Sequence, residues 1–220
     1  MKFICVAATT LFLSCGSIMC LAGERVCPET IHNAYEHAQC REKDLSKHYP
    51  GLFSRADLRL IVNLTNGGEK VYTDDERKNL WYTFVAYYPE IGYGLIWAQF
   101  YEDGTNYLVN MRTGKDTDIV GDPILSPDKK RIAVSNVDLE AQYTPNVLSV
   151  YELRPDGLAV EFIEKPAEWG PWNLRWVTNQ EISFIKYSFD SESPYKVREI
   201  PKTLKYVKTN KNGTGKWIIK

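Results

Sequence analysis

The sequence predicts an all-β fold: a small or incomplete β-propeller-like stack of antiparallel units, preceded by a short N-terminal helical segment. Three observations lead to this prediction. From residue 56 onward, short β-branched and aromatic runs alternate with turns rich in Gly, Pro, Asn and Asp. A strand–turn–strand rhythm recurs with a period of about 40 residues. Only residues 27–49 have the spacing of apolar residues that is typical of a helix.

Residues 1–22 have the features of a secretory signal peptide. Lys2 gives a positive start, residues 3–21 carry no charge, and Cys20 and Ala22 place small residues at −3 and −1 of a cleavage site. We expect cleavage and export to the periplasm or the medium. A membrane anchor is one alternative, because the apolar run approaches the length that spans a bilayer. A lipoprotein signal with Cys15 as the acylated residue is another.

Removal of this segment leaves a chain of roughly 198 residues, a length that fits one domain. The remaining chain has 26 basic and 28 acidic residues and therefore a net charge of −2. Binding to nucleic acid or to an anionic membrane surface would require a basic stripe, which this mixed-sign composition does not suggest. We therefore expect neither partner, and no membrane span after cleavage.

The predicted helical segment begins near Pro28, which suits a first helical turn because its missing N–H is not needed there. Helical spacing continues through Ile31, Ala34, Tyr35 and Ala38, and Pro50-Gly51 ends it. We expect residues 23–55 to form this N-terminal helical segment and residues 56–220 to form the β domain.

Cys27 and Cys40 are the two cysteines that remain after cleavage. Two cysteines in an oxidising compartment usually pair, so we expect a disulfide within the helical segment. A metal site or a reactive thiol is the alternative, although the chain offers neither a CxxC motif nor a second cysteine pair.

The β domain opens with a predicted hairpin, in which residues 58–64 and 69–72 flank the turn Asn66-Gly67-Gly68. Aromatic-rich strands follow at residues 81–88 and 93–101. Further turns are expected at Asp103-Gly104 and Thr113-Gly114, with short strands at residues 106–111 and 116–120.

The later part of the chain repeats this rhythm. Residues 106–135 and 146–188 each show the same order: two strands joined by a turn, then a proline, then a turn or loop that leads into a third strand. Residues 195–219 begin this order again. Stacked β-sheet units produce such a repeat, and the chain length allows about four of them at that period.

The segment Pro123–Ala133 resembles the SPDGK-type strand–turn–strand element of TolB-like and WD40-like propeller repeats. Lys129 stands where those repeats usually have Gly. Together with residues 87–93, 138–146 and 168–176, the element resembles a family of uncharacterised exported bacterial proteins over most of the mature chain. This resemblance implies a propeller-like fold and no particular activity.

No motif assigns catalysis, a metal or a cofactor. His32 shares a helical face with Glu29 and Glu36, which is ligand-like geometry, but a solvated polar face explains the same residues. The sequence contains no phosphate-binding loop and no GxSxG elbow. Asp138 and Glu140, two residues apart, are the candidates for a paired-carboxylate site.

Exposed aromatic residues are the main candidates for binding. Three tryptophans lie within residues 169–176, and the Gly-Pro pair between Trp169 and Trp172 disfavours a regular strand, so we expect at least one indole to project from a loop. The long connection of residues 138–146 adds acids and a tyrosine. We expect Asp138, Glu140, Tyr143, Trp169 and Trp172 to form one binding face.

These features favour an exported, non-catalytic binding protein that engages a protein or glycan of the cell envelope. A carboxylate-dependent hydrolase acting on envelope polysaccharide is the first alternative. A structural scaffold of an envelope complex, joined through exposed strand edges, is the second.

Overall fold

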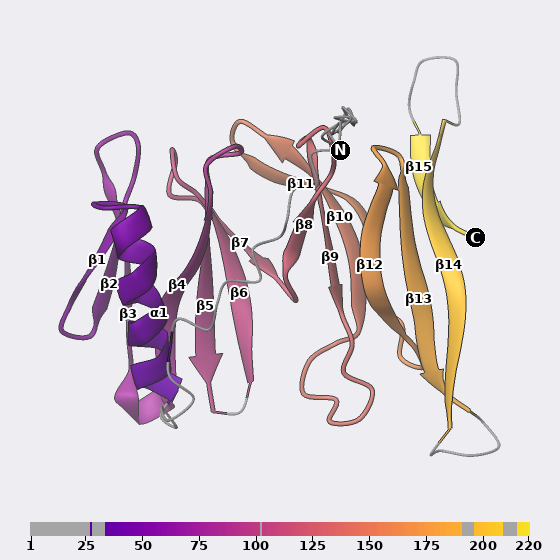
Figure 1. Ribbon diagram of the computed structural model, residues 1–220, viewed down its shortest axis with the longest axis horizontal. Helices are drawn as coiled ribbons and strands as arrows, with labels where there is room; N and C mark the ends of the chain where they lie inside the picture. The colour runs from indigo at the N-terminus through magenta and orange to yellow at the C-terminus, as the bar shows by residue number, and fades with distance from the viewer. Residues whose placement is uncertain (1–26, 28–33, 102, 191–195, 209–214) are drawn as a thin grey trace, which may run out of the picture.

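The computed structural model describes residues 27, 34–101, 103–190, 196–208 and 215–220. One helix and four antiparallel sheets follow one another along the chain, and the sheets stand in a row along its longest axis (Figure 1). The predicted all-β, propeller-like fold is confirmed. The signal segment and Cys15 lie outside the described residues. Within the described part of the chain, no helix combines the length and apolar character needed to cross a membrane.

Every sheet is a meander of strands in chain order. The first sheet contains β1 (Phe53–Ala56), β2 (Arg59–Asn63) and β3 (Glu69–Thr73), and the short 3₁₀ helix η1 (Glu76–Lys78) follows it. The second contains β4 (Leu80–Tyr88), β5 (Tyr93–Phe100), β6 (Asp103–Asn110) and β7 (Asp116–Ile119). The third contains β8 (Pro123–Leu125), β9 (Arg131–Asn136), β10 (Val147–Arg154) and β11 (Gly157–Glu164). The fourth contains β12 (Gly170–Thr178), β13 (Glu181–Phe189), β14 (Val197–Lys208) and β15 (Gly215–Ile219).

Helix α1 (Ala34–His48) lies against β4. The turn at Pro50-Gly51 ends it, with Gly51 at φ 78°, a backbone conformation that glycine adopts without strain. Cys27 and Cys40 form a disulfide with a Cα–Cα distance of 5.8 Å, in agreement with the predicted pair.

Two elements differ from the sequence prediction. Strand β1 begins at Phe53, inside the segment that we expected to precede the β domain. Asp103-Gly104 is the start of β6 rather than a turn, because the chain already reverses at Tyr101, whose φ is 51°. Gly104 is required there, since a Cβ at that position would overlap the Trp97 ring and the backbone of Ala98.

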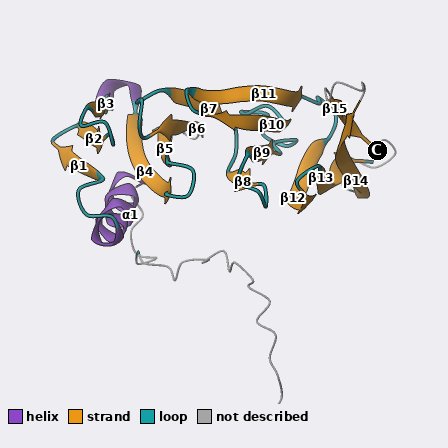
Figure 2. Ribbon diagram, turned by 90° about the horizontal axis from the view of Figure 1, so that it is seen from above, coloured by secondary structure: helices purple, strands orange, loops and turns teal. Residues whose placement is uncertain are grey.

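Apolar side chains fill the spaces between successive sheets. Phe53 and Phe84 stack with ring centroids 4.6 Å apart between the first and second sheets. Leu108 and Ile132 belong to a cluster between the second and third sheets, and Leu148 to one between the third and fourth. The final strands β7, β11 and β15 line one side of this stack, whereas β8 and β12 lie on the other (Figure 2). This fan of meanders is the propeller-like feature of the fold.

Polar contacts also join neighbouring sheets. Tyr72 donates its hydroxyl hydrogen to Asp116 Oδ2 at 3.1 Å, between the first and second sheets. Arg131 on β9 forms a bidentate ion pair with Glu161 on β11, at 2.6 and 3.0 Å. The indole Nε1 of Trp217 on β15 donates to the same carboxylate at 3.0 Å, which links the third and fourth sheets.

A buried ionic network attaches the helix and the first sheet to β4. Arg55 on β1 donates to both carboxylate oxygens of Glu42, at 2.8 and 2.9 Å, and to Asp74 Oδ2 at 2.7 Å. These carboxylates accept the backbone N–H groups of Phe84 and Tyr82, at 3.0 and 2.8 Å. Because β4 is an edge strand, the network satisfies donors that no strand pairs.

We expect Arg55→Ala to lower the free energy of unfolding by about 3–5 kcal/mol, because it leaves two buried carboxylates without their counter-ion. Urea unfolding followed by tryptophan fluorescence measures the loss. The exposed Arg59→Ala on β2 is the matched control and should change stability by less than about 0.5 kcal/mol. A loss below about 1 kcal/mol for Arg55→Ala would show that the network is not structural.

The SPDKK turn between β8 and β9 adopts the geometry that usually requires glycine. Lys129 has φ 57°, in the left-handed region. The turn is held by Asp128, whose Oδ1 accepts from Ser126 Oγ at 2.7 Å and from the Lys130 N–H at 3.1 Å. Local hydrogen bonds therefore impose this conformation on a lysine, at the position where the SPDGK-type repeats have glycine.

Lys129→Gly should raise the free energy of unfolding by about 0.5–1 kcal/mol. Relief of about 1–2 kcal/mol of left-handed strain outweighs about 0.4–1 kcal/mol of added unfolded-state entropy. Lys130→Gly lacks the strain relief and should instead lower stability. Denaturant midpoints for the two variants give the comparison, and shifts of the same sign would contradict this account.

Candidate functional site

A hollow of about 360 Å³ lies beside β12, where the β9–β10 loop meets the outward face of the fourth sheet. The residues that line it come from this loop and from two strands of that sheet: Val137, Asp138, Leu139, Glu140, Ala141, Trp172 and Tyr187. The hollow therefore combines two aromatic rings with two carboxylate side chains and an apolar wall.

Asp138 organises the loop from within. Its Oδ1 accepts the N–H groups of Ala141 and Gln142 at 3.1 and 3.0 Å, and its Oδ2 accepts the N–H of Thr144 at 2.9 Å. These backbone hydrogen bonds, that of Thr144 foremost, lower the pKa of the Asp138 carboxyl. The carboxylate thus stabilises the loop conformation that shapes the hollow.

Asparagines at its two ends attach the loop to the strands. Asn146 Oδ1 accepts the Asp138 N–H at 2.8 Å, and Asn146 Nδ2 donates to Pro166 O at 3.3 Å. Asn136 Nδ2 donates to Thr144 Oγ1 at 2.9 Å. Leu139 is buried and anchors the loop from its middle. The wall of the hollow is therefore held by polar and apolar contacts together.

Strand β12 supplies the opposite side of the hollow. A Cβ at Gly170 would overlap the side chain of Val137, so glycine allows the loop to approach the strand closely. Our prediction that Gly170-Pro171 would interrupt the strand was wrong, because both residues lie in β12 and pair with β13. Pro171 is tolerated because β12 is an edge strand.

The two tryptophans that flank this pair lie in different surroundings. Trp172 is 56% exposed and lines the hollow. Trp169 is partly buried in the cluster between the third and fourth sheets, and its ring stacks on that of Phe184 with centroids 6.0 Å apart. The Lys186 ammonium lies 5.3 Å from the Trp169 ring centroid. Trp176 also packs inward, and its Nε1 donates to Ile124 O at 2.9 Å.

Of the five residues predicted to form one binding face, Asp138, Glu140 and Trp172 line the same hollow. Tyr143 lies on the same loop and is 65% exposed, but it is not among the lining residues. The sequence prediction missed Tyr187. Alternation along β13 places Tyr187 on the same face as Ile185, the cross-strand partner of Trp172, and only the pairing of β12 with β13 identifies it.

The lining residues do not resemble a pair of catalytic acids. Asp138 uses both oxygens within its loop, and its pKa is lowered rather than raised as a general acid would require. Among the described residues, no group of three or more His, Cys, Asp or Glu side chains could hold a metal ion. Glu29 and His32 of the predicted helical face lie outside the described residues.

Comparison with known proteins leaves the family open. No family model matches the chain, and no curated protein matches it. Among solved structures, the N-terminal domain of Nup159 aligns over 76% of this chain with 10% sequence identity and a TM-score of 0.30. The chain spans 57% of the length of that domain.

The hydrogen bonds to Asp138 predict a pH response of the loop. Since the folded pKa is lowered, the stabilisation is complete above the unfolded value of about 3.9 and is lost as pH falls through the folded pKa. We expect the amide shifts of Ala141 and Thr144 to titrate with a midpoint below about 3.9 in NMR spectra. Glu140→Gln should retain this titration, whereas Asp138→Asn should abolish it. A midpoint at or above that value would be inconsistent with these bonds.

Proposed function

We propose that the protein is an exported, non-catalytic binding protein of the periplasm or cell surface, and that its ligand, a protein or glycan of the envelope, occupies the hollow beside β12. One observation carries the proposal: Trp172 is more than half exposed, and it lines, together with Tyr187, a hollow whose wall is a loop held by hydrogen bonds to Asp138.

An exposed indole in such a setting favours binding over packing. Tryptophan has a large apolar side chain, and it is enriched among the few interface residues that contribute most of the binding free energy. Glu140 and the backbone of the loop add hydrogen-bond acceptors next to the ring. A ligand that presents an apolar face and several hydroxyl or amide donors would match this combination.

Export is supported by the disulfide between Cys27 and Cys40, since such bonds persist in oxidising compartments. Binding is favoured over a paired-carboxylate mechanism because Asp138, one of the two acids that line the hollow among the described residues, uses both oxygens within its loop.

Trp172→Ala should weaken retention of the envelope ligand at least tenfold, because truncating a central aromatic anchor typically costs about 2 kcal/mol or more. The measurement is affinity capture by the exported, tagged protein from envelope extract of its own host, followed by mass spectrometry and glycan analysis. Val177→Ala is the matched control, since Val177 lies on the same strand and is also 56% exposed. Equal capture by wild type and Trp172→Ala would refute the site.

A further inference from the structure

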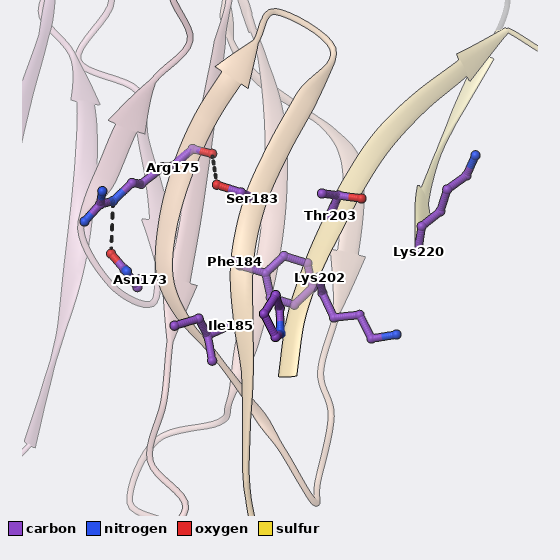
Figure 3. Close-up of a pocket in the computed structure, with 9 residues that line it drawn as sticks. Asn173, Arg175, Ser183, Phe184, Ile185, Lys202, Thr203 and Lys220 are labelled. Carbon is purple, nitrogen blue, oxygen red and sulfur yellow. Dashed lines mark hydrogen bonds between the residues drawn. The ribbon is translucent and has the colours of Figure 1, made fainter. Parts of the chain in front are cut away.

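A second hollow, of about 370 Å³, lies on the outward face of the fourth sheet (Figure 3). One row of residues crosses the first three strands there and ends at Lys220, directly after the fourth. Arg175 pairs with Ser183, Ser183 pairs with Thr203, and Thr203 exchanges two backbone hydrogen bonds with Lys220, at 3.2 and 2.8 Å. Two hydroxyl groups therefore lie between cationic side chains, as Figure 3 shows.

The lining of this second hollow has an excess of positive charge. Arg175, Lys202 and Lys220 line it, and no carboxylate side chain is among the described residues that do so. Two acids lie on the same face outside this lining: Glu181 is paired with Lys205 at 3.0 Å, and the exposed Glu199 on β14 lies opposite Tyr187. Arg175 is exposed, and its Nε donates to Asn173 Oδ1 at 3.1 Å, which orients the guanidinium group. The surface is thus complementary to anions.

The spacing of the cations favours an extended ligand. Arg175 lies on β12 and Lys220 follows β15, which places them three strand spacings, or roughly 14 Å, apart across the sheet. In Figure 3 their side chains lie on opposite sides of Ser183 and Thr203. With the side chains in these orientations, a chain with repeated acidic groups could contact both cations at once.

The two hollows adjoin each other through one cross-strand pair. Ile185 lines the second hollow, and Trp172, its cross-strand partner, lines the first. We propose that the ligand is an anionic glycan, with one sugar packed on Trp172 and the acidic groups of neighbouring sugars on the row from Arg175 to Lys220. This inference rests on the proposed function, and it names the chemical class of the ligand.

The carboxylates of the first hollow favour a glycan over a nucleic acid. Sugar hydroxyl groups can donate hydrogen bonds to the Glu140 carboxylate, whereas phosphodiester oxygens only accept hydrogen bonds and would be repelled by it. An anionic glycan with uncharged faces satisfies both hollows.

Calorimetric titration of the exported protein with tetragalacturonate and with its methyl ester tests the inference, because esterification removes the charges and leaves the sugar chain unchanged. Sulfated and unsulfated cellotetraose form a second pair, which separates sulfate from carboxylate recognition. We expect the anionic member of at least one pair to bind at least tenfold more tightly. Arg175→Gln and Lys220→Gln should each remove most of that preference.

Equal affinity for both members of each pair would overturn the anionic inference and leave the proposed binding function standing. Tighter binding of a single-stranded oligothymidylate than of either anionic glycan would also overturn it. Binding of neither pair, together with intact Trp172-dependent capture of an envelope protein, would replace the glycan with a protein ligand. Lys208→Gln, an exposed charge change on β14 outside both hollows, is the control and should leave the preference unchanged.

Discussion

The unpaired edge of β4 is the constraint on which the first half of the stack depends. The N–H groups of Tyr82 and Phe84 point away from β5 and would be buried without partners. Carboxylates from α1 and from the end of the first sheet accept them, and Arg55 neutralises both acids. The same residues therefore end the second sheet, seat the helix and fix the position of the first sheet.

The later sheets solve the same edge problem without a helix. Strand β8 is short, and β12 carries Pro171 and a positive φ at Asn173, devices that weaken pairing with another chain. Bulges in β12 also separate residues that simple alternation would place together. Trp172 on this edge strand is exposed, whereas Trp169, which directly precedes the strand, is partly buried against the core.

Local patterns predicted most strands, because alternation and turn residues act over a few positions. The period of about 40 residues predicted about four units, and the structure has four sheets. Strand β1 was missed since its four residues are too short for a pattern, and Gly170-Pro171 was misread since only the sheet order makes β12 an edge. The grouping of Asp138, Glu140 and Trp172 was predicted from residue types and their positions in the sequence. Tyr187 could be identified only from the register between β12 and β13.

The outward face of the fourth sheet differs from every face inside the stack. Interior faces hold aliphatic and aromatic clusters, whereas this face has a row of hydroxyl and cationic side chains and the paired charges of Glu181 and Lys205. Covering such a face with an apolar sheet would bury charges at high cost, so these polar side chains favour contact with solvent. A solvated face that adjoins an exposed indole is suited to binding, because it needs no rearrangement to meet a ligand.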